Sequence, residues 1–296
     1  MRRLRPLLLL ALTSSLQAQE ESEAEPPAVR RETPSWSLSG GFRHLGGAGL
    51  GPGAEVSVAR SDFGAWLGLP LGGGHRLSLG PYLRQYDYRF DGTSPLGSDP
   101  FSTIRSLGFR ASLSDPLGED WHLTNTILVE NTESPGARLS GRTGKWIAWA
   151  GWETSEDLTF YGGAFFFEGI EERFAVPLLG FSWDFARSLG LRSDARGTRL
   201  EYRAAEDWRL SLGWDADVSQ ARLAPSDAVP DGVLQHLEFD LGIQASWQPA
   251  PGRSLRFGLL TNLFLDLELQ DARGRRVADA QGDPGWILFL HGLWTF

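Results

Sequence analysis

Three pairs of acidic residues occupy alternate positions in the last third of the chain: Asp215 and Asp217, Glu238 and Asp240, and Asp266 and Glu268. Alternate residues of a β-strand point to the same side, so each pair would project from one face of its strand. Carboxylates that crowd together must be solvated or matched by cations. The pairs therefore predict either a water-filled wall that prefers positive solutes, or ion pairs with arginines such as Arg84, Arg110 or Arg209.

Three further polar residues, His236, Arg256 and Asn262, lie on the same strand faces as these acids. Together with the six carboxylates they are predicted to line the interior, or lumen, of a closed β-barrel. A metal site is the weaker interpretation, because His236, Glu238 and Asp240 form a flat row rather than a group around one point. We predict no metal site and expect a salt-bridge network in its place.

The histidines also give little support for catalysis. Outer-membrane phospholipases carry a His and a Ser two residues apart on a strand, and none of the five histidines has a Ser at that spacing. His122 with Thr124 comes nearest, but both are predicted to face the lumen, away from lipid. The chain has no cysteine, which excludes thiolate ligands and cysteine nucleophiles. We predict no catalytic residue and no cofactor.

The acids lie in three long stretches in which apolar and polar residues alternate, with the apolar line predicted to face lipid. These lines are Trp208, Leu210, Leu212, Trp214, Ala216 and Val218; then Val233, Leu237, Phe239, Leu241, Ile243, Ala245 and Trp247; then Leu255, Phe257, Leu259, Thr261, Leu263, Leu265, Leu267 and Leu269. Strands of soluble sandwiches usually have about five or six residues, whereas these have about 16, enough to cross a bilayer at a tilt.

Short turns alternate with longer polar loops at 91–102, 132–143, 224–231 and 271–285, as in a barrel with tight periplasmic turns and larger outer loops. We predict an all-β fold, a closed antiparallel transmembrane β-barrel over residues 35–296. The twelve predicted strands lie near 35–45, 54–70, 75–90, 103–114, 121–131, 144–153, 158–168, 174–185, 207–223, 232–248, 253–270 and 286–296. A short hairpin at 189–192 and 198–203 would make 14. Bulges are expected at Pro81 and near Asp62, where the alternation changes phase.

Aromatic residues gather at the predicted periplasmic ends of the strands. Amphipathic indole rings collect at the level of lipid headgroups, so these residues predict one membrane girdle. Its members are Trp36, Trp121, Trp152, Trp208, Trp247, Trp294 and Phe296.

The first residues predict export. Residues 1–18 combine a basic start, a short apolar run and small residues before Gln19, as in a cleaved signal peptide. Residues 19–34 are acidic, rich in proline and aperiodic, which predicts a disordered leader. The formal charge of −9 becomes −12 once Arg2, Arg3 and Arg5 are removed. So acidic a chain is a poor partner for nucleic acid.

The last strand resembles the carboxy-terminal signal of bacterial outer-membrane barrels, with Trp294 and Phe296 at the aromatic positions and Gly292 displaced by one. The resemblance implies recognition by the barrel-assembly machinery. Trp286, Leu288, Leu290, Trp294 and Phe296 are predicted to face lipid, and Ile287, Phe289, His291 and Leu293 the lumen.

A broader resemblance covers most of the predicted barrel. Its motifs are Gly68-Leu-Pro-Leu71, Leu77-Ser-Leu79, Tyr82-Leu-Arg-Gln-Tyr-Asp-Tyr88, Pro177-Leu-Leu-Gly-Phe-Ser-Trp183 and Leu200-Glu-Tyr-Arg203. They resemble a family of bacterial outer-membrane barrels known only as a domain of unknown function. The resemblance implies a barrel and an outer membrane, and no activity.

The sequence as a whole favours a pore for small solutes with an acidic lumen wall. The alternative is a structural or adhesive barrel with a plugged lumen, and a hydrolase is the less favoured third possibility. The lipid bilayer is the predicted partner. Lipopolysaccharide is a second one, through the Arg273-Gly274-Arg275-Arg276 cluster in a predicted outer loop.

Overall fold

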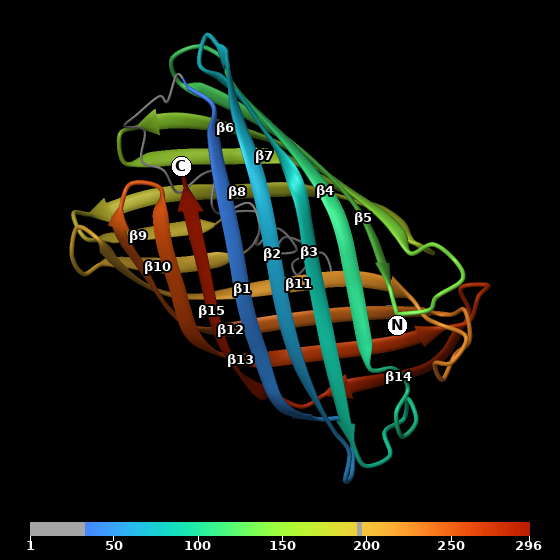
Figure 1. Ribbon diagram of the computed structural model, residues 1–296. Helices are drawn as coiled ribbons and strands as arrows, with labels where there is room; N and C mark the ends of the chain where they lie inside the picture. The colour runs from blue at the N-terminus through green and yellow to red at the C-terminus, as the bar shows by residue number, and fades with distance from the viewer. Residues whose placement is uncertain (1–32, 194–196) are drawn as a thin grey trace.

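The computed structural model describes residues 33–193 and 197–296 (Figure 1). The predicted signal peptide at 1–18, and the predicted leader up to residue 32, lie outside this range. The described residues form strands and connections, with no helix that could span a membrane. The strands are β1 (Ser35–Gly49), β2 (Glu55–Gly72), β3 (His75–Asp91), β4 (Thr103–Pro116), β5 (Trp121–Glu133), β6 (Arg142–Ser155), β7 (Leu158–Glu168), β8 (Arg173–Ala186), β9 (Leu189–Ser193), β10 (Thr198–Arg203), β11 (Trp208–Arg222), β12 (Val233–Ala250), β13 (Arg253–Gln270), β14 (Arg276–Gly282) and β15 (Gly285–Thr295).

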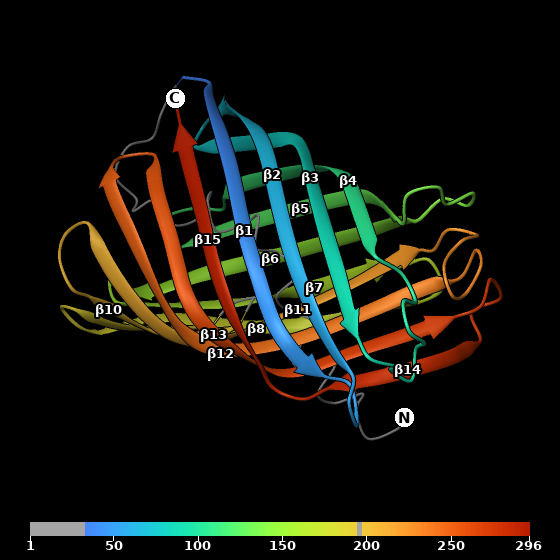
Figure 2. The same ribbon diagram turned by 60° about the horizontal axis from the view of Figure 1, so that its bottom comes forward.

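The strands close into one antiparallel barrel (Figures 1 and 2). Each strand from β1 to β12 pairs with the next, β12 pairs with β13, and β15 pairs with both β13 and β1. β14 continues the line of β15 and pairs with the second half of β13. Fifteen labelled strands therefore form a barrel of 14.

The preference for 12 strands was wrong, and the hairpin that would make 14 is present as β9 and β10. The predicted loop at 271–285 also contains a strand, β14. The strand was not predicted, because its charged residues face water rather than lipid and are typical of a polar loop.

The two ends of the barrel differ. Both described chain ends and most of the two- to four-residue turns lie at one end, here called the terminal end. The longer connections at 92–102, 134–141 and 223–232 lie at the far end, together with shorter ones such as 169–172. Backbone bonds between Trp36 and Phe296 join the two ends of the chain at 2.7 and 3.2 Å. Because β1 pairs with β15, the barrel wall has no open edge there.

The hairpin of β9 and β10 is too short to fill its part of the wall. β9 pairs with β8 only from Phe181 onward, and β10 pairs with β11 only up to Gly213. Beyond this level no strand formed by the described residues lies between β8 and β11. The far half of β11 leaves the wall and forms a parallel bridge with β5, between Arg222 and Glu133. The Ser134 amide also donates to the Arg222 carbonyl at 2.8 Å.

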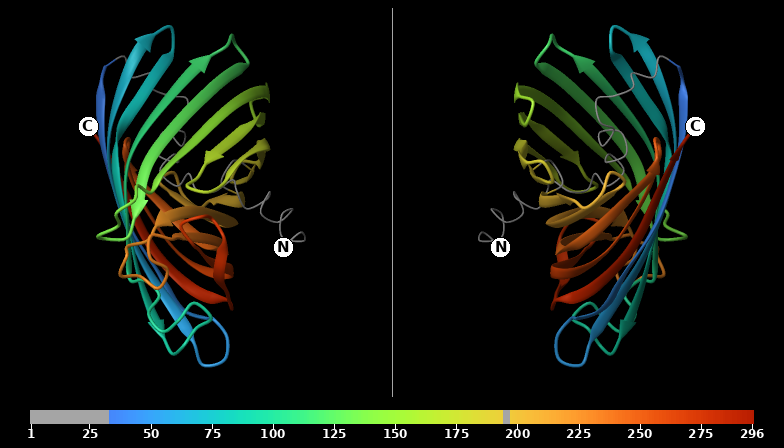
Figure 3. Two further views of the ribbon diagram at one scale, coloured as in Figure 1. Left: turned by 90° about the vertical axis from the view of Figure 1, so that its right-hand side faces the viewer. Right: turned by 90° about the vertical axis from the view of Figure 1, so that its left-hand side faces the viewer.

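The strands β6, β7 and β8 cover the outer face of the displaced β11 and β12, and we call them the flap. Figure 3 shows the flap strands in green to yellow-green on one side of the interior and β1–β3 in blue to teal on the other. Side chains of the flap and of β11 and β12 form one buried apolar cluster: Ile147, Trp149, Phe165, Phe167, Val176, Leu178, Ala216, Val218 and Leu237. Ala216 and Val218, predicted to face lipid, are therefore covered by protein.

The far end of the interior is filled by a second apolar cluster, here called the far-end plug. It includes Tyr88 and Phe90 of β3 and four leucines of β13, and it receives Leu96, Phe101, Leu223 and Val229 from two connections that fold inward. The amide of Ala228 donates to the carbonyl of Pro100 at 2.8 Å, which ties these two connections together. The lumen is closed at this end by packed side chains.

A β-bulge in β13 changes which side chains face the interior. Phe239 pairs with Phe264 and the next residue, Asp240, pairs with Asn262, so Leu263 is the extra residue. Beyond it the faces exchange, and Leu265, Leu267 and Leu269 are buried in the plug. Asp266 and Glu268 point outward, so the prediction that they line the lumen was wrong. The pairing of β2 with β3 keeps one register from Glu55 to Pro70. The bulges expected at Pro81 and near Asp62 are therefore absent.

Candidate functional site

A layer of charged side chains crosses the interior beside the far-end plug. Arg43 of β1 and Arg60 of β2 are direct partners in the sheet and both point inward. Opposite them, Asp217 of β11 and Glu238 and Asp240 of β12 also point inward, because polar residues take the interior positions of both strands. The displacement of β11 toward β5 brings these acids within reach of the arginines.

Two arginines and three carboxylates join the opposite walls. Arg43 donates to Glu238 at 2.5 Å and also to Asp240. Arg60 donates to Asp217 at 3.0 Å. These ion pairs decide between the two predictions for the acidic wall. Asp217, Glu238 and Asp240 are matched by Arg43 and Arg60, two arginines that the sequence did not single out.

Charged and aromatic groups of β3, β5 and β6 extend the layer. Tyr82 donates to Glu130 at 2.6 Å, and Lys145 forms an ion pair with Glu130 at 3.2 Å. Lys145 also donates to the carbonyl of Val218 at 3.4 Å, on the β11 edge that has no strand partner. The Arg84 guanidinium lies over the Tyr82 ring at 6.0 Å from its centroid.

The layer is electrically balanced and almost completely buried. We define the charge layer as Arg43, Arg60, Arg84, Lys145, Glu130, Asp217, Glu238 and Asp240, four cations and four anions, each at most 9% exposed. Buried ion pairs recover the cost of desolvation only when their geometry is good. A barrel that needed only stability could fill this volume with apolar side chains at no greater cost. The charge layer is therefore the candidate functional site.

Two other predicted lumen residues connect the layer to its surroundings. His236 lies between the hydroxyl of Tyr88, 2.7 Å from its Nδ1 atom, and Glu238, 3.6 Å from its Nε2 atom. The Asn262 amide donates to Asp240 at 2.9 Å and to the carbonyl of Phe264 at 3.1 Å, beside the bulge. His236 thus joins the charge layer to the plug, and Asn262 joins it to the bulge.

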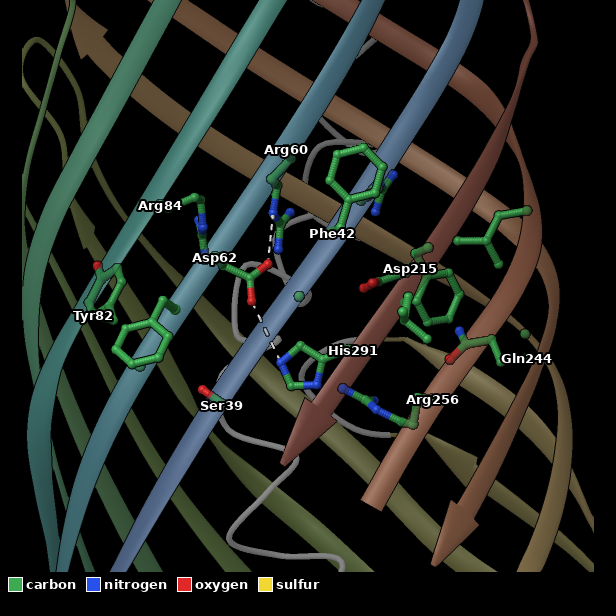
Figure 4. Close-up of a pocket in the computed structure, with 18 of the residues that line it drawn as sticks. Ser39, Phe42, Arg60, Asp62, Tyr82, Arg84, Asp215, Gln244, Arg256 and His291 are labelled. Carbon is green, nitrogen blue, oxygen red and sulfur yellow. Dashed lines mark ion pairs between the residues drawn. The ribbon is translucent and has the colours of Figure 1, made fainter. Parts of the chain in front are cut away.

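A small cavity of about 70 Å³ lies on the terminal side of the charge layer (Figure 4). His291 and Asp62, with 3.5 Å between Nε2 and Oδ2, lie on one side of it. Asp215 and Arg256 also line it, as predicted for lumen residues. The interior therefore contains polar space between the charge layer and the terminal end.

Most predicted lumen residues point inward, and the residues that sequence reasoning missed are arginines. The interior positions hold Asp215, Asp217, His236, Glu238, Asp240, Arg256 and Asn262, and only Asp266 and Glu268 fall outside. Arg43 and Arg60 were not predicted as partners of the acids. A signal for them existed, because both occupy the lumen-facing positions of their strands.

The predicted girdle lies on the outer surface near the terminal end. Trp121 stacks on Trp152 with ring centroids 5.7 Å apart, and Trp208 stacks on Trp247 at 6.0 Å. Trp36, Trp294 and Phe296 are exposed, while Trp208 and Trp247 are half-buried. The Trp247 indole donates to Asp207 at 2.9 Å, which orients one ring of the girdle.

Within the described residues, no group of three or more His, Asp or Glu side chains is placed to hold a metal ion. His122 and Thr124, the nearest approach to a hydrolytic pair, both point inward. Neither side chain is therefore directed toward lipid outside the barrel.

Comparison with solved structures identifies the fold. An outer-membrane channel from Pseudomonas putida F1 is similar with a TM-score of 0.50 and 10% identity, over 93% of this chain and 100% of that one. A FadL homologue from Pseudomonas aeruginosa is similar with a TM-score of 0.46 and 11% identity, over 89% and 90% of the two chains. The fold is that of outer-membrane β-barrels.

No protein-family model and no curated protein matches the chain. The resemblance to the barrel family of unknown function therefore stays a prediction.

Proposed function

We propose that this chain is a bacterial outer-membrane channel for small polar solutes, closed in the observed conformation by the charge layer and the far-end plug. The observation that carries the proposal is Arg43, which bridges Glu238 and Asp240 across the interior. Buried charges need water or partners, so an interior built from them suits a path that fills with water when it opens. Barrels of 16–18 strands leave an aqueous channel and eight strands leave almost none, so a barrel of 14 has room for a path.

The proposal changes the expected selectivity. An uncompensated acidic wall, which is one of the two alternatives that the sequence leaves open, would select cations. In the charge layer the acids face arginines, so the wild-type channel should have weak charge preference when open. Removing either side of the layer should expose the other side and create a preference.

Single-channel recording in planar bilayers tests the proposal. We expect the refolded wild-type protein to open rarely, and Arg43→Ala to open more often with a preference for cations. Glu238→Gln with Asp240→Asn should give the opposite preference. The control is Arg89→Ala, which removes an exposed arginine on the outer face of β3.

A structural barrel with a plugged lumen is the second candidate, favoured by the apolar far-end plug. Replacement of Leu96 and Phe101 by serine loosens one of the inward connections without touching the charge layer. If wild type, Arg43→Ala and this variant all fail to conduct, the channel proposal is wrong and the plugged barrel is the better description.

The proposed site of action is the outer membrane, after export with a cleaved signal peptide. The terminal end would face the periplasm, with the girdle at the level of the headgroups and the last strand recognised by the barrel-assembly machinery. Contact with lipopolysaccharide is proposed for Arg273. Arg275 and Arg276 pair within the protein, with Asp271 at 2.7 Å and with Asp279.

A further inference from the structure

A second cavity, of about 330 Å³, opens at the terminal end beside the turns that join β8 to β9 and β10 to β11. The charge layer does not contribute to it. Four arginines line it, together with three acids: Arg187, Arg192, Arg203, Arg209, Asp157, Asp184 and Glu201. A cavity of this size is in the range that holds a small organic ligand.

Arg203 and Arg209 both belong to the lining. They are direct partners across β10 and β11, so their side chains project from the same face. Their neighbours Tyr202 and Leu210 are exposed on the outer surface, which places both guanidinium groups on the interior side. Like charges directly opposite one another destabilise a sheet unless something compensates them.

The acids around the cavity are largely committed to other groups. Arg192 lies 2.5 Å from Asp184, and Arg199 donates to Glu201 at 2.9 Å. Asp207, in the turn between the two strands, accepts from Trp247. Among residues 33–193 and 197–296, no carboxylate forms an ion pair with Arg187, Arg203 or Arg209, and Asp157 is the one lining acid outside an ion pair.

A third arginine extends the positive surface along the wall. In the rows of paired residues, Arg203 is opposite Arg209, Arg209 is opposite Ser246, and Ser246 is opposite Arg256. Arg256 lines the smaller cavity deeper in the barrel. The terminal half of the interior is therefore basic along this row, whereas the charge layer is balanced.

We infer that the larger cavity is a binding site for a small organic anion, with a carboxylate or phosphate group held between Arg203 and Arg209. Guanidinium groups bind both groups through paired hydrogen bonds in a planar fork. The anion supplies the charge that the cross-strand pair lacks. Arg187 lies at the rim and adds a third positive group. The site goes beyond the proposed channel function, since binding needs no passage through the charge layer.

Isothermal titration of the full-length folded barrel in a zwitterionic detergent at low salt tests the inference. The probes are citrate for carboxylates, pyrophosphate for phosphates, and glucose as an uncharged comparison. We expect saturable binding of at least one anion and none of glucose. Arg203→Gln with Arg209→Gln should weaken that binding at least tenfold. Retained circular dichroism and heat-modifiable gel migration would show that the variant is folded.

Two further variants separate a built site from general attraction. Arg253→Gln removes a positive charge at the same end, from an exposed position on the outer face of β13, and should leave the affinity within about twofold. Arg203→Lys with Arg209→Lys keeps the charge but loses the planar fork, and should give intermediate affinity. Absence of saturable anion binding, or equal loss in the Arg253→Gln and double glutamine variants, overturns the inference. Neither result bears on conductance, so the channel proposal is tested separately.

Discussion

The inward-facing side chains of β1–β5 differ from those of the flap, although the strands themselves are similar. The inward positions of β1–β5 hold Arg43, Arg60, Arg84, Tyr82 and Glu130, whereas those of β6–β8 hold mainly aromatic and branched aliphatic residues. Both sets face β11 and β12, from opposite sides. One displaced strand can therefore be buried on both faces if one face carries Asp217 and the other carries Val218.

Alternation of apolar and polar residues therefore marks the two faces of a strand, but it does not distinguish a face that meets lipid from one that is covered by protein. On β11 the apolar line faces lipid as far as Trp214 and faces the flap beyond it. The same residue types serve both environments, since each excludes water. Mutations that distinguish the two interiors would test this comparison.

The largest effect is expected from the charged side. Arg43→Leu leaves Glu238 and Asp240 buried without their cation, which should cost about 3–5 kcal/mol of the free energy of unfolding. Urea unfolding in lipid vesicles, followed by tryptophan fluorescence, measures it. Adding Glu238→Gln and Asp240→Asn should recover most of the loss. No recovery would show that Arg43 acts through packing rather than charge.

A substitution on the apolar side should cost less of the free energy of unfolding, and a change of charge elsewhere should not restore the loss. Leu178→Ala opens a hole between β8 and β11, with an expected cost of about 2–3 kcal/mol. The same unfolding measurement at low and high salt should give equal losses, because no charge is involved. Leu179→Ala is the matched control, since the Leu179 side chain, next to Leu178 in sequence, is 84% exposed on the outer face of β8. Equal losses in the two variants would contradict the covered position of Leu178.

Lys145 lies between the charged and the apolar side chains of the interior, so its substitution should disturb contacts on both sides. It contacts Glu130 on the charged side and the Val218 carbonyl on β11, and its ammonium lies 6.0 Å from the Phe167 ring. A double-mutant cycle of Lys145→Met with Glu130→Gln should give a coupling of about 1–3 kcal/mol. A cycle of Lys145→Met with Leu178→Ala should give a clearly smaller coupling. Equal couplings would remove the distinction between the two sides.

The smallest effect is expected at an exposed connection outside both interiors. The backbone amide of Arg275 and its guanidinium both donate to Asp271, and they lower the pKa of this carboxyl. A lowered pKa stabilises the turn above the ordinary carboxyl pKa, and the effect is lost as pH falls through the folded value. NMR titration of Asp271 in wild type and Arg275→Gln should show a higher pKa in the variant. An unchanged pKa would contradict the contact.

Much of the wall could be predicted from the sequence, because a membrane-spanning strand repeats every two residues. The facing of β11, β12 and β15 followed from alternation alone, as for Asp240 inside and Ile243 outside. The error in β13 had a physical cause. Its leucines continue the same alternation past Leu263, and the bulge exists only in the pairing with Phe239 and Asp240.

The strand count and the ion pairs needed information that no single strand carries. β9 and β10 are too short to be predicted from the sequence as strands that cross a membrane. The barrel accommodates this short hairpin because the flap covers the part of the wall that the hairpin leaves unfilled. Arg43 meets Glu238 only because β11 and β12 move inward, toward β5. Contacts across the interior depend on the shape of the closed barrel rather than on local pattern.

The bridge between Glu133 and Arg222 acts as a chord across a ring. A chord can form only after both of its attachment points are in place, and these are separated by the whole of the flap and the β9–β10 hairpin. Forming it therefore requires a long loop closure, and few backbone bonds hold the bridge itself. Segments held by few backbone bonds open more readily than strands paired along their length, so we expect the closed barrel to begin to widen at this bridge.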